Sequence, residues 1–255
     1  MKQKKQVVVA AKNLKKSFST GGNEQTIING LDLKVYRGDF TVIMGSSGAG
    51  KSTLMYALSG MDRPNGGQVL FCGEDITNYK DDKLAVFRRK HCGFVFQQIY
   101  LLERMTLLEN AIAAGKLTEH NKQKLKEKAS KLFAKVNISE VLQKKYSSQI
   151  SGGEAQRAGI VRALMNEPAV VFADEPTGAL NSNNSQAVLD VFSEVNREGQ
   201  SIIMVTHDKK TALRANRIIY LKDGIIFGEC CLDTYKGADK EREHKLNTFL
   251  EEMGW

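Results

Sequence analysis

Short apolar runs alternate with amphipathic segments along most of this chain. The largely apolar runs are 40–44, 93–96, 169–173 and 201–206. Such runs are typical of strands that are buried on both faces of a parallel sheet. Apolar residues recur at helical spacing around Leu84, over 107–114, over 118–136, after Ser151 and over 188–195. Strands that alternate with helices predict an α/β protein with a mostly parallel sheet.

Two further pairs of segments have the pattern of antiparallel strands. Residues 7–14 and 26–36 are rich in β-branched or alternating apolar residues, and Gly21-Gly22-Asn23 between them predicts a loose turn. Residues 217–222 and 225–229 flank Asp223-Gly224, which favours a tight hairpin. We therefore expect an antiparallel β-subdomain at the N-terminus and a hairpin late in the chain.

The length and composition are those of an ordinary globular protein. With 255 residues, 42% of them hydrophobic, the chain is long enough to bury a full core, and we expect one domain over 1–255. The apolar run near the start is too short for a signal peptide, and no run has transmembrane length, so we place the chain in the cytoplasm. The cysteines Cys72, Cys92, Cys230 and Cys231 lack the spacing of a metal site or a disulfide framework, which favours reduced thiols.

The formal charge of +8 is concentrated in the N-terminal tail and in residues 122–135. Around the second segment, over 118–136, one helical stripe is apolar and lysines lie on the other sides; the stripe consists of Leu125, Ala129, Leu132, Phe133 and Val136. A lysine face serves either solubility or nucleic-acid binding. The lack of interleaved aromatic residues favours a solvated face, so no nucleic-acid partner is expected.

The stretch from Phe40 to Leu54 is an apolar strand that breaks into a glycine-rich turn before a helix. Its glycines can direct backbone N–H groups towards a polyphosphate, Lys51 can reach the β and γ phosphates, and Ser52 can offer its hydroxyl to Mg²⁺. A plain connecting turn is the alternative, but every fixed position of the P-loop pattern G-x-x-x-x-G-K-S matches. The predicted nucleotide-binding residues here are Gly45, Ser46, Ser47, Gly48, Ala49, Gly50, Lys51, Ser52 and Thr53. The stretch predicts a nucleoside-triphosphate site.

Acidic and basic side chains follow two of the buried strands. An acid at the end of an apolar strand needs a cation or hydrogen bonds, so Asp174 is predicted to hold Mg²⁺ through its water shell. Glu175, one residue further on, can polarise an attacking water, although a helix cap is the alternative for the pair. His207 follows the strand at 201–206, at the sheet edge where ligands of α/β proteins collect, and either contacts a γ-phosphate or is structural.

Three other positions allow a structural and a functional interpretation. Ser151 and Glu154 have the spacing of a capping box, yet a serine followed by Gly152-Gly153 at a helix start also suits an anion. Phe18, just before the first turn, either packs at a strand end or stacks on a base. Gln97, after the strand at 93–96, is either a solvent contact or a ligand.

Taken together, these motifs resemble the nucleotide-binding domain of ABC transporters over nearly the whole chain. They are Gly45-Ser-Ser-Gly-Ala-Gly-Lys-Ser, Gln97, Ser151-Gly-Gly-Glu-Ala-Gln-Arg, Asp174-Glu175 and Thr206-His207-Asp208. The resemblance implies a RecA-like P-loop NTPase core with the antiparallel β-subdomain and an inserted helical subdomain at about 98–166. It also implies a head-to-tail homodimer in which each of two ATP molecules lies between the P-loop of one subunit and the Ser-Gly-Gly helix of the other.

The resemblance further implies a role for each site residue. Lys51 and Ser52 bind phosphate and Mg²⁺, Gln97 reaches the metal and the attacking water, and Asp174 orients the metal. Glu175 is the catalytic base and His207 holds the γ-phosphate. Ser151, Gly152 and Gly153 contact the γ-phosphate bound to the partner, and Phe18 matches the aromatic residue that stacks on adenine.

Three positions depart from the family pattern: Ile150 replaces a leucine, Glu103 stands where relatives often carry proline, and Asn181 replaces an aspartate of the interface loop. The chain looks most like a bacitracin-export ATPase, a type that serves antimicrobial-peptide resistance, within the branch of macrolide-export and lipoprotein-release ATPases. We expect a peripheral protein on the cytoplasmic face of the membrane that works with a separate integral membrane permease. The rival functions are an ABC protein acting on ribosomes or DNA and a small-molecule kinase.

The C-terminal segment 245–255 carries an apolar stripe. It consists of Leu246, Phe249, Leu250 and Met253. The stripe either contacts a partner or, as we favour, docks on the chain's own sheet.

Overall fold

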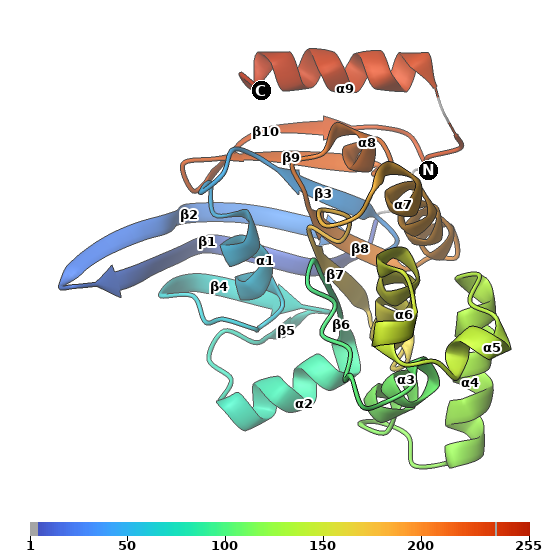
Figure 1. The fold of residues 1–255 in the computed structure, drawn as a ribbon. Coiled ribbons are helices and arrows are strands. Elements are labelled where there is room, and N and C mark those ends of the chain that lie inside the picture. The colour runs from blue at the N-terminus through green and yellow to red at the C-terminus, as the bar shows by residue number, and fades with distance from the viewer. Residues whose placement is uncertain (1–4, 238) are drawn as a thin grey trace. The chain divides into compact units, whose positions relative to one another are not determined.

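The computed structural model describes residues 5–237 and 239–255, and it confirms the α/β class (Figure 1). The chain forms two compact units. The first combines Met1–Leu84 with Gly199–Trp255, and the second is Ala85–Glu198. The boundary falls within helix α2 (Asp81–His91), and each unit is described by itself below.

The first unit contains the predicted antiparallel sheet. Its strands are β1 (Val7–Thr20), β2 (Asn23–Tyr36), β4 (Gly66–Phe71) and β5 (Glu74–Asp75), in the order β2-β1-β4-β5. The β1–β2 hairpin extends well beyond the predicted strands 7–14 and 26–36. The alternation of apolar and polar residues in β1 is interrupted near Asn13, which has a φ of 45° and lies at a shift in the pairing register. Beyond this point the two strands are polar but remain paired through their backbones, so Phe18 lies within β1 rather than after it.

The first unit also contains strands of the mixed sheet: β3 (Phe40–Met44), β8 (Ser201–Val205), β9 (Arg217–Lys222) and β10 (Ile225–Cys231). Their order is β10-β9-β3-β8, with β3 parallel to β8 and β9 and with β9 and β10 forming the predicted hairpin. Every residue of β3 and β8 is buried. This explains their apolar sequences, because neither face is open to water.

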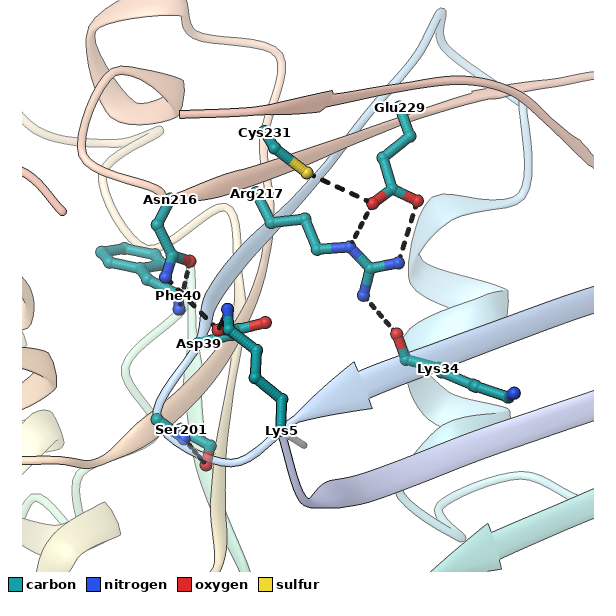
Figure 2. Close-up of polar contacts among 10 residues, drawn as sticks. Lys5, Lys34, Asp39, Phe40, Ser201, Asn216, Arg217, Glu229 and Cys231 are labelled. Atoms are coloured by element: carbon teal, nitrogen blue, oxygen red, sulfur yellow. Dashed lines mark hydrogen bonds and ion pairs between the residues drawn. The ribbon is translucent and has the colours of Figure 1, made fainter. Parts of the chain in front are cut away.

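An arginine joins strands of the two sheets of this unit (Figure 2). Arg217 Nε and Nη2 donate to Glu229 at 2.6 and 2.9 Å, and Nη1 donates to the backbone carbonyl of Lys34 in β2. Burial disfavours the arginine's charge, but the hydrogen bonds and charge of Glu229 outweigh it and raise the pKa of Arg217. The same hydrogen bonds lower the pKa of Glu229. The pair therefore fixes β9 and β10 against the antiparallel sheet.

Helix α9 (Lys240–Glu252) carries the predicted C-terminal stripe and docks on its own unit, beside β10 (Figure 1). Leu246, Phe249 and Leu250 are buried. A Cβ at Gly228 of β10 would lie 2.4 Å from Met253 Sδ, so the helix packs directly against that strand. The favoured prediction, docking on the chain's own sheet, is confirmed. This unit also contains α1 (Lys51–Leu58) and α8 (Lys209–Ala212).

The second unit pairs two parallel strands with helices. The strands are β6 (Cys92–Phe96) and β7 (Val170–Asp174). The helices are α3 (Leu107–Gly115), α4 (Lys122–Lys135), α5 (Glu140–Gln143), α6 (Gly152–Leu164) and α7 (Ser182–Arg197). The short α5 and α8 were not predicted, because a four-residue helix is too short to show a helical period.

The predicted lysine-rich helix is α4, which begins four residues later than the predicted segment 118–136. Asn121 caps it by accepting hydrogen bonds from two backbone N–H groups, so its start is set by that side chain. The stripe residues Leu125, Ala129, Phe133 and Val136 are buried as predicted, whereas Leu132 is half-buried at its edge. Across the described ranges 5–237 and 239–255, no helix combines the length and apolarity needed to cross a membrane.

Candidate nucleotide-binding site

The P-loop connects β3 to α1 within the first unit. Gly45 has a φ of +150°, and a Cβ there would lie 2.1 Å from the carbonyl oxygen of Leu221 in β9. Only glycine fits a backbone that approaches another strand so closely. Gly48 also has a positive φ, +79°, but the space around it is open. Gly45 is thus required by packing and Gly48 by backbone conformation alone.

The loop ends at a helix start that has no side-chain cap of its own. Gly50 occupies the N-cap position in the left-handed conformation and has no side chain with which to cap α1. Lys51 Nζ donates to the carbonyls of Gly45 and Ser46 at 2.9 and 2.8 Å, so the lysine lies along the loop. Ser46, Ser47 and Gly48 form the exposed rim, while Lys51, Ser52 and Thr53 are half-buried. A helix N-terminus with this lysine suits an anion.

His207 lies at the same sheet edge as the P-loop. Ile43 of β3 is in register with Val205 of β8, and Thr206 N donates to Ile43 O at 3.3 Å. The carboxyl ends of the two strands therefore meet, with the P-loop following one and the exposed His207 following the other. The fold thus brings together two predicted site features that are about 160 residues apart in the sequence.

Phe18 is an exposed aromatic of β1 in the same unit. Its side chain is 45% exposed. Lys16 Nζ lies 4.8 Å from the ring centroid and forms a 2.7 Å salt bridge with Asp62. The ring is therefore held beside a buried lysine and still offers open surface for stacking.

The predicted acids and Gln97 belong to the second unit. Phe96 of β6 is in register with Asp174 of β7, so Gln97 and Glu175 follow the ends of neighbouring parallel strands. Glu175 has a φ of 46°, which is unusual for a residue with a side chain and often marks a functional position. A Cβ at Gly178 would lie 2.9 Å from Gln97 Nε2, so the turn after Glu175 reaches the Gln97 side chain.

The start of helix α6 has the predicted capping box. Ser151 Oγ accepts from Glu154 N at 3.3 Å, and Glu154 Oε2 accepts from Ser151 N at 2.7 Å. Hydrogen bonds from the backbone and hydroxyl of Ser151 lower the pKa of Glu154. A Cβ at Gly153 would lie 2.8 Å from the Asn184 side chain, so this glycine allows α6 to approach α7. Capping thus accounts for Ser151 and Glu154, and packing accounts for Gly153.

Asn181, the departure in the interface loop, caps helix α7. Its side chain accepts a hydrogen bond from Asn184 N at 3.0 Å. Asparagine and aspartate are about equally good N-caps, so the exchange preserves this local role.

Two residues of α6 for which the sequence predicted no role hold the segment around Gln97. Gln156 Nε2 donates to Phe96 O at 2.9 Å, and Arg162 Nη2 donates to Ile99 O at 2.8 Å. Gln156 is 1% exposed. The sequence signals for Gln156 are its place in the Ser151-Gly-Gly-Glu-Ala-Gln-Arg motif and its amide among small and apolar neighbours on the helix.

The predicted site residues thus form four local groups, two in each unit. The first unit holds the P-loop with His207, and separately Phe18. The second holds Gln97 with Asp174 and Glu175, and the Ser151-Gly152-Gly153 helix start. In the described part of the chain, no three His, Cys, Asp or Glu side chains gather as a metal site. The oxygen donors of Ser52, Gln97 and Asp174 are nevertheless of the type that Mg²⁺ takes together with phosphate and water.

The glycine loop after a buried parallel strand, with Lys51 at the helix start, defines a P-loop nucleotide-binding protein. Residues 28–178 match the model of the ABC transporter family. This chain belongs to that family, as an ABC transporter ATP-binding domain.

Curated relatives cover the chain almost entirely. It is 37% identical over 248 residues to the bacitracin export ATP-binding protein BceA of Halalkalibacterium halodurans, a match covering 97% of this chain and 96% of that protein. It is 41% identical over 224 residues to the macrolide export ATP-binding/permease protein MacB of Pasteurella multocida, covering 88% of this chain. The match spans only 34% of that longer relative.

A solved structure shares the fold. It is the dimeric structure of MJ0796, a bacterial ABC transporter cassette, with a TM-score of 0.82 and 33% identity. The match covers 89% of this chain and 100% of that one.

Proposed function

We propose that this chain binds and hydrolyses ATP to drive a separate membrane permease, and that the transported or sensed substance is a peptide antibiotic such as bacitracin or a lantibiotic. The observation that carries the proposal is the P-loop, whose glycines, helix start and Lys51 together suit a triphosphate. The similarity to a bacitracin export protein along nearly the full length of both chains supports the choice of cargo.

In this proposal each local group has a chemical role. Lys51 and the loop N–H groups bind the β and γ phosphates, and Phe18 stacks on adenine. Glu175 accepts a proton from the attacking water, whose oxygen bonds to the γ-phosphorus as ADP leaves with the bridging oxygen. His207 and Gln97 orient the γ-phosphate and the water. Ser52, Gln97 and Asp174 would hold Mg²⁺, which would supply positive charge to offset that of the phosphate oxygens.

The active form in this proposal is a head-to-tail homodimer. Ser151, Gly152 and Gly153 then contact the γ-phosphate bound to the partner subunit. The capping box engages the N–H and the hydroxyl of Ser151 with Glu154, so the hydroxyl must turn from Glu154 to reach the phosphate, whereas the N–H groups of Gly152 and Gly153 are directed out of the helix start. The similarity to a dimeric cassette supports the arrangement.

The permease partner is proposed to dock on the second unit and to hold the chain at the cytoplasmic face of the membrane. Three large apolar side chains between Gln97 and α3 are exposed: Tyr100 by 60%, Leu102 by 55% and Met105 by 36%. An exposed apolar cluster of this kind is typical of a protein-interaction surface. Its place directly after Gln97 offers a route from the permease to the nucleotide.

Macrolide export and lipoprotein release are the alternative transport functions. The similarity to a macrolide export protein favours the first of these. Deletion of the gene tests all three, with growth measured in peptide antibiotics, macrolides and envelope stress. Peptide sensitivity supports the proposed cargo, whereas unchanged peptide sensitivity with a macrolide or lipoprotein-sorting defect refutes it.

Two rivals outside transport predict different biochemistry. A kinase would release almost no phosphate with water as the only acceptor. A protein acting on ribosomes or DNA would be retained by nucleic acid at physiological salt and would not co-purify with a permease. We expect steady phosphate release in water and co-purification with an integral membrane protein in mild detergent.

The Glu175→Gln variant tests the catalytic assignment. It removes the base but leaves the phosphate contacts, so we expect unchanged ATP binding and turnover reduced by about a hundredfold or more. The variant is also expected to accumulate as an ATP-bound dimer on gel filtration. Wild-type turnover in this variant would refute the role of Glu175.

A further inference from the structure

A buried arginine in the first turn of α9 holds a neighbouring backbone segment of the same unit. Arg242 is 8% exposed. Its Nε donates to the carbonyl oxygen of Leu213 at 2.6 Å, and its Nη2 and Nη1 donate to those of Ala215 and Asp233. All three guanidinium nitrogens are thus used on backbone carbonyls. An arginine used in this way fixes the path of the chain that it contacts.

Two of these carbonyls belong to the segment that leads away from His207. That segment is short: Asp208 caps α8 by accepting from Lys210 N and Thr211 N at 3.3 and 2.9 Å, and Leu213 follows the helix directly. A single-turn helix with a capped start transmits a shift at its end to its beginning, because little free backbone lies between.

The near side of His207 is anchored independently. Thr206 is 1% exposed, its N–H pairs with Ile43 O, and its Oγ1 accepts from Asp208 N at 3.0 Å. The backbone is therefore held on one side of His207 by β3, at Thr206, and on the other side by Arg242, at Leu213 and Ala215.

The rest of α9 has its own attachment. Phe249 and Met253 pack against Gly228 of β10, two to three turns away from Arg242. These two contacts with β10 do not involve the segment after His207. Removing the guanidinium is expected to release that segment without undocking the helix.

We propose that Arg242 is a positioning residue for His207, acting through the backbone of 208–215, so that the C-terminal helix sets the rate of ATP hydrolysis rather than the affinity for ATP. This inference rests on the proposed role of His207 at the γ-phosphate. The P-loop, which supplies most of the predicted phosphate contacts, is not among the contacts of Arg242.

The test compares Arg242→Met and Arg242→Lys in the purified full-length chain, with Lys245→Met as control because Lys245 is exposed on the same helix. Arg242→Met is expected to lower kcat by about tenfold, since a misplacement of about 1 Å can cost up to about a hundredfold. The KM for ATP should change less than about twofold. Arg242→Lys, which keeps the charge and N–H donors, should recover part of kcat, and Lys245→Met should match the wild type.

Combination with His207→Ala separates positioning from general destabilisation. If Arg242 acts through His207, Arg242→Met causes no further loss of kcat in the His207→Ala background. An equal fractional loss in both backgrounds, or wild-type kcat in Arg242→Met, overturns the inference and leaves the proposed function standing. Wild-type kcat in His207→Ala alone overturns the role of His207, and the inference with it.

Discussion

Two of the P-loop glycines, Gly45 and Gly48, are expected to respond very differently to substitution by alanine. At Gly45 the added Cβ would lie 2.1 Å from a backbone oxygen of Leu221, well inside the 3.0 Å that real Cβ atoms keep. Either β9 or the loop must move by about 1 Å, and the left-handed φ adds strain, so we estimate a loss of about 3 to 5 kcal/mol. At Gly48 only the conformational cost of about 1 to 2 kcal/mol applies, because the surrounding space is open.

These values convert into measurable shifts of Tm and of ATP affinity. A loss of 1 kcal/mol lowers Tm by about 2 to 4 °C in a chain of this size, so Gly45→Ala should lose about 6 to 20 °C and Gly48→Ala about 2 to 8 °C. A displaced loop also loses at least one charge-assisted hydrogen bond to phosphate, worth about 1.5 to 3 kcal/mol. The Kd for ATP should therefore rise by about tenfold to a hundredfold in Gly45→Ala.

Circular dichroism melting and titration with a fluorescent ATP analogue measure both quantities on the same preparations. Gly48→Ala serves as the matched control, since it changes the same loop by the same methyl group. Equal Tm values for the two variants, together with wild-type affinity in Gly45→Ala, would refute the argument from close packing against β9.

Two other predictions concern hydrogen-bonded acids and caps. Glu229→Gln should lower Tm at pH 7, because the lowered pKa of Glu229 stabilises the fold above the ordinary glutamate value of about 4.3. The difference from wild type should vanish as pH falls through the lowered pKa, and a constant difference in pH-dependent melting would contradict the ion pair. Ser151→Ala and Thr106→Ala each break a capping box and should each lose about 1 kcal/mol of unfolding free energy. Only Ser151→Ala should also weaken ATP-dependent dimerisation, and equal effects of both on gel filtration would contradict the interface role.

The sequence by itself determined the class of fold and the chemistry of the candidate site. Strands such as 201–205 are buried on both faces, so their apolar composition identifies them as strands without information from the rest of the chain. The P-loop is equally local, because its glycines, lysine and serine lie within eight consecutive positions and each suits the phosphate for its own reason. The β9–β10 hairpin was likewise specified by Asp223-Gly224.

Strand length, the requirement for glycine and the burial of an arginine depend on contacts with residues distant in the sequence, so they became clear only from the tertiary structure. The β1–β2 hairpin continues past its apolar pattern because each strand hydrogen-bonds to the other, which composition does not record. Position 45 requires glycine because the backbone of Leu221 lies close to it. The buried guanidinium of Arg242 is satisfied by carbonyls such as that of Leu213, about 30 residues away in the sequence. In both cases the distant partner is a backbone carbonyl, which is chemically the same in every residue, so the residue type at the partner position does not reveal the contact in advance.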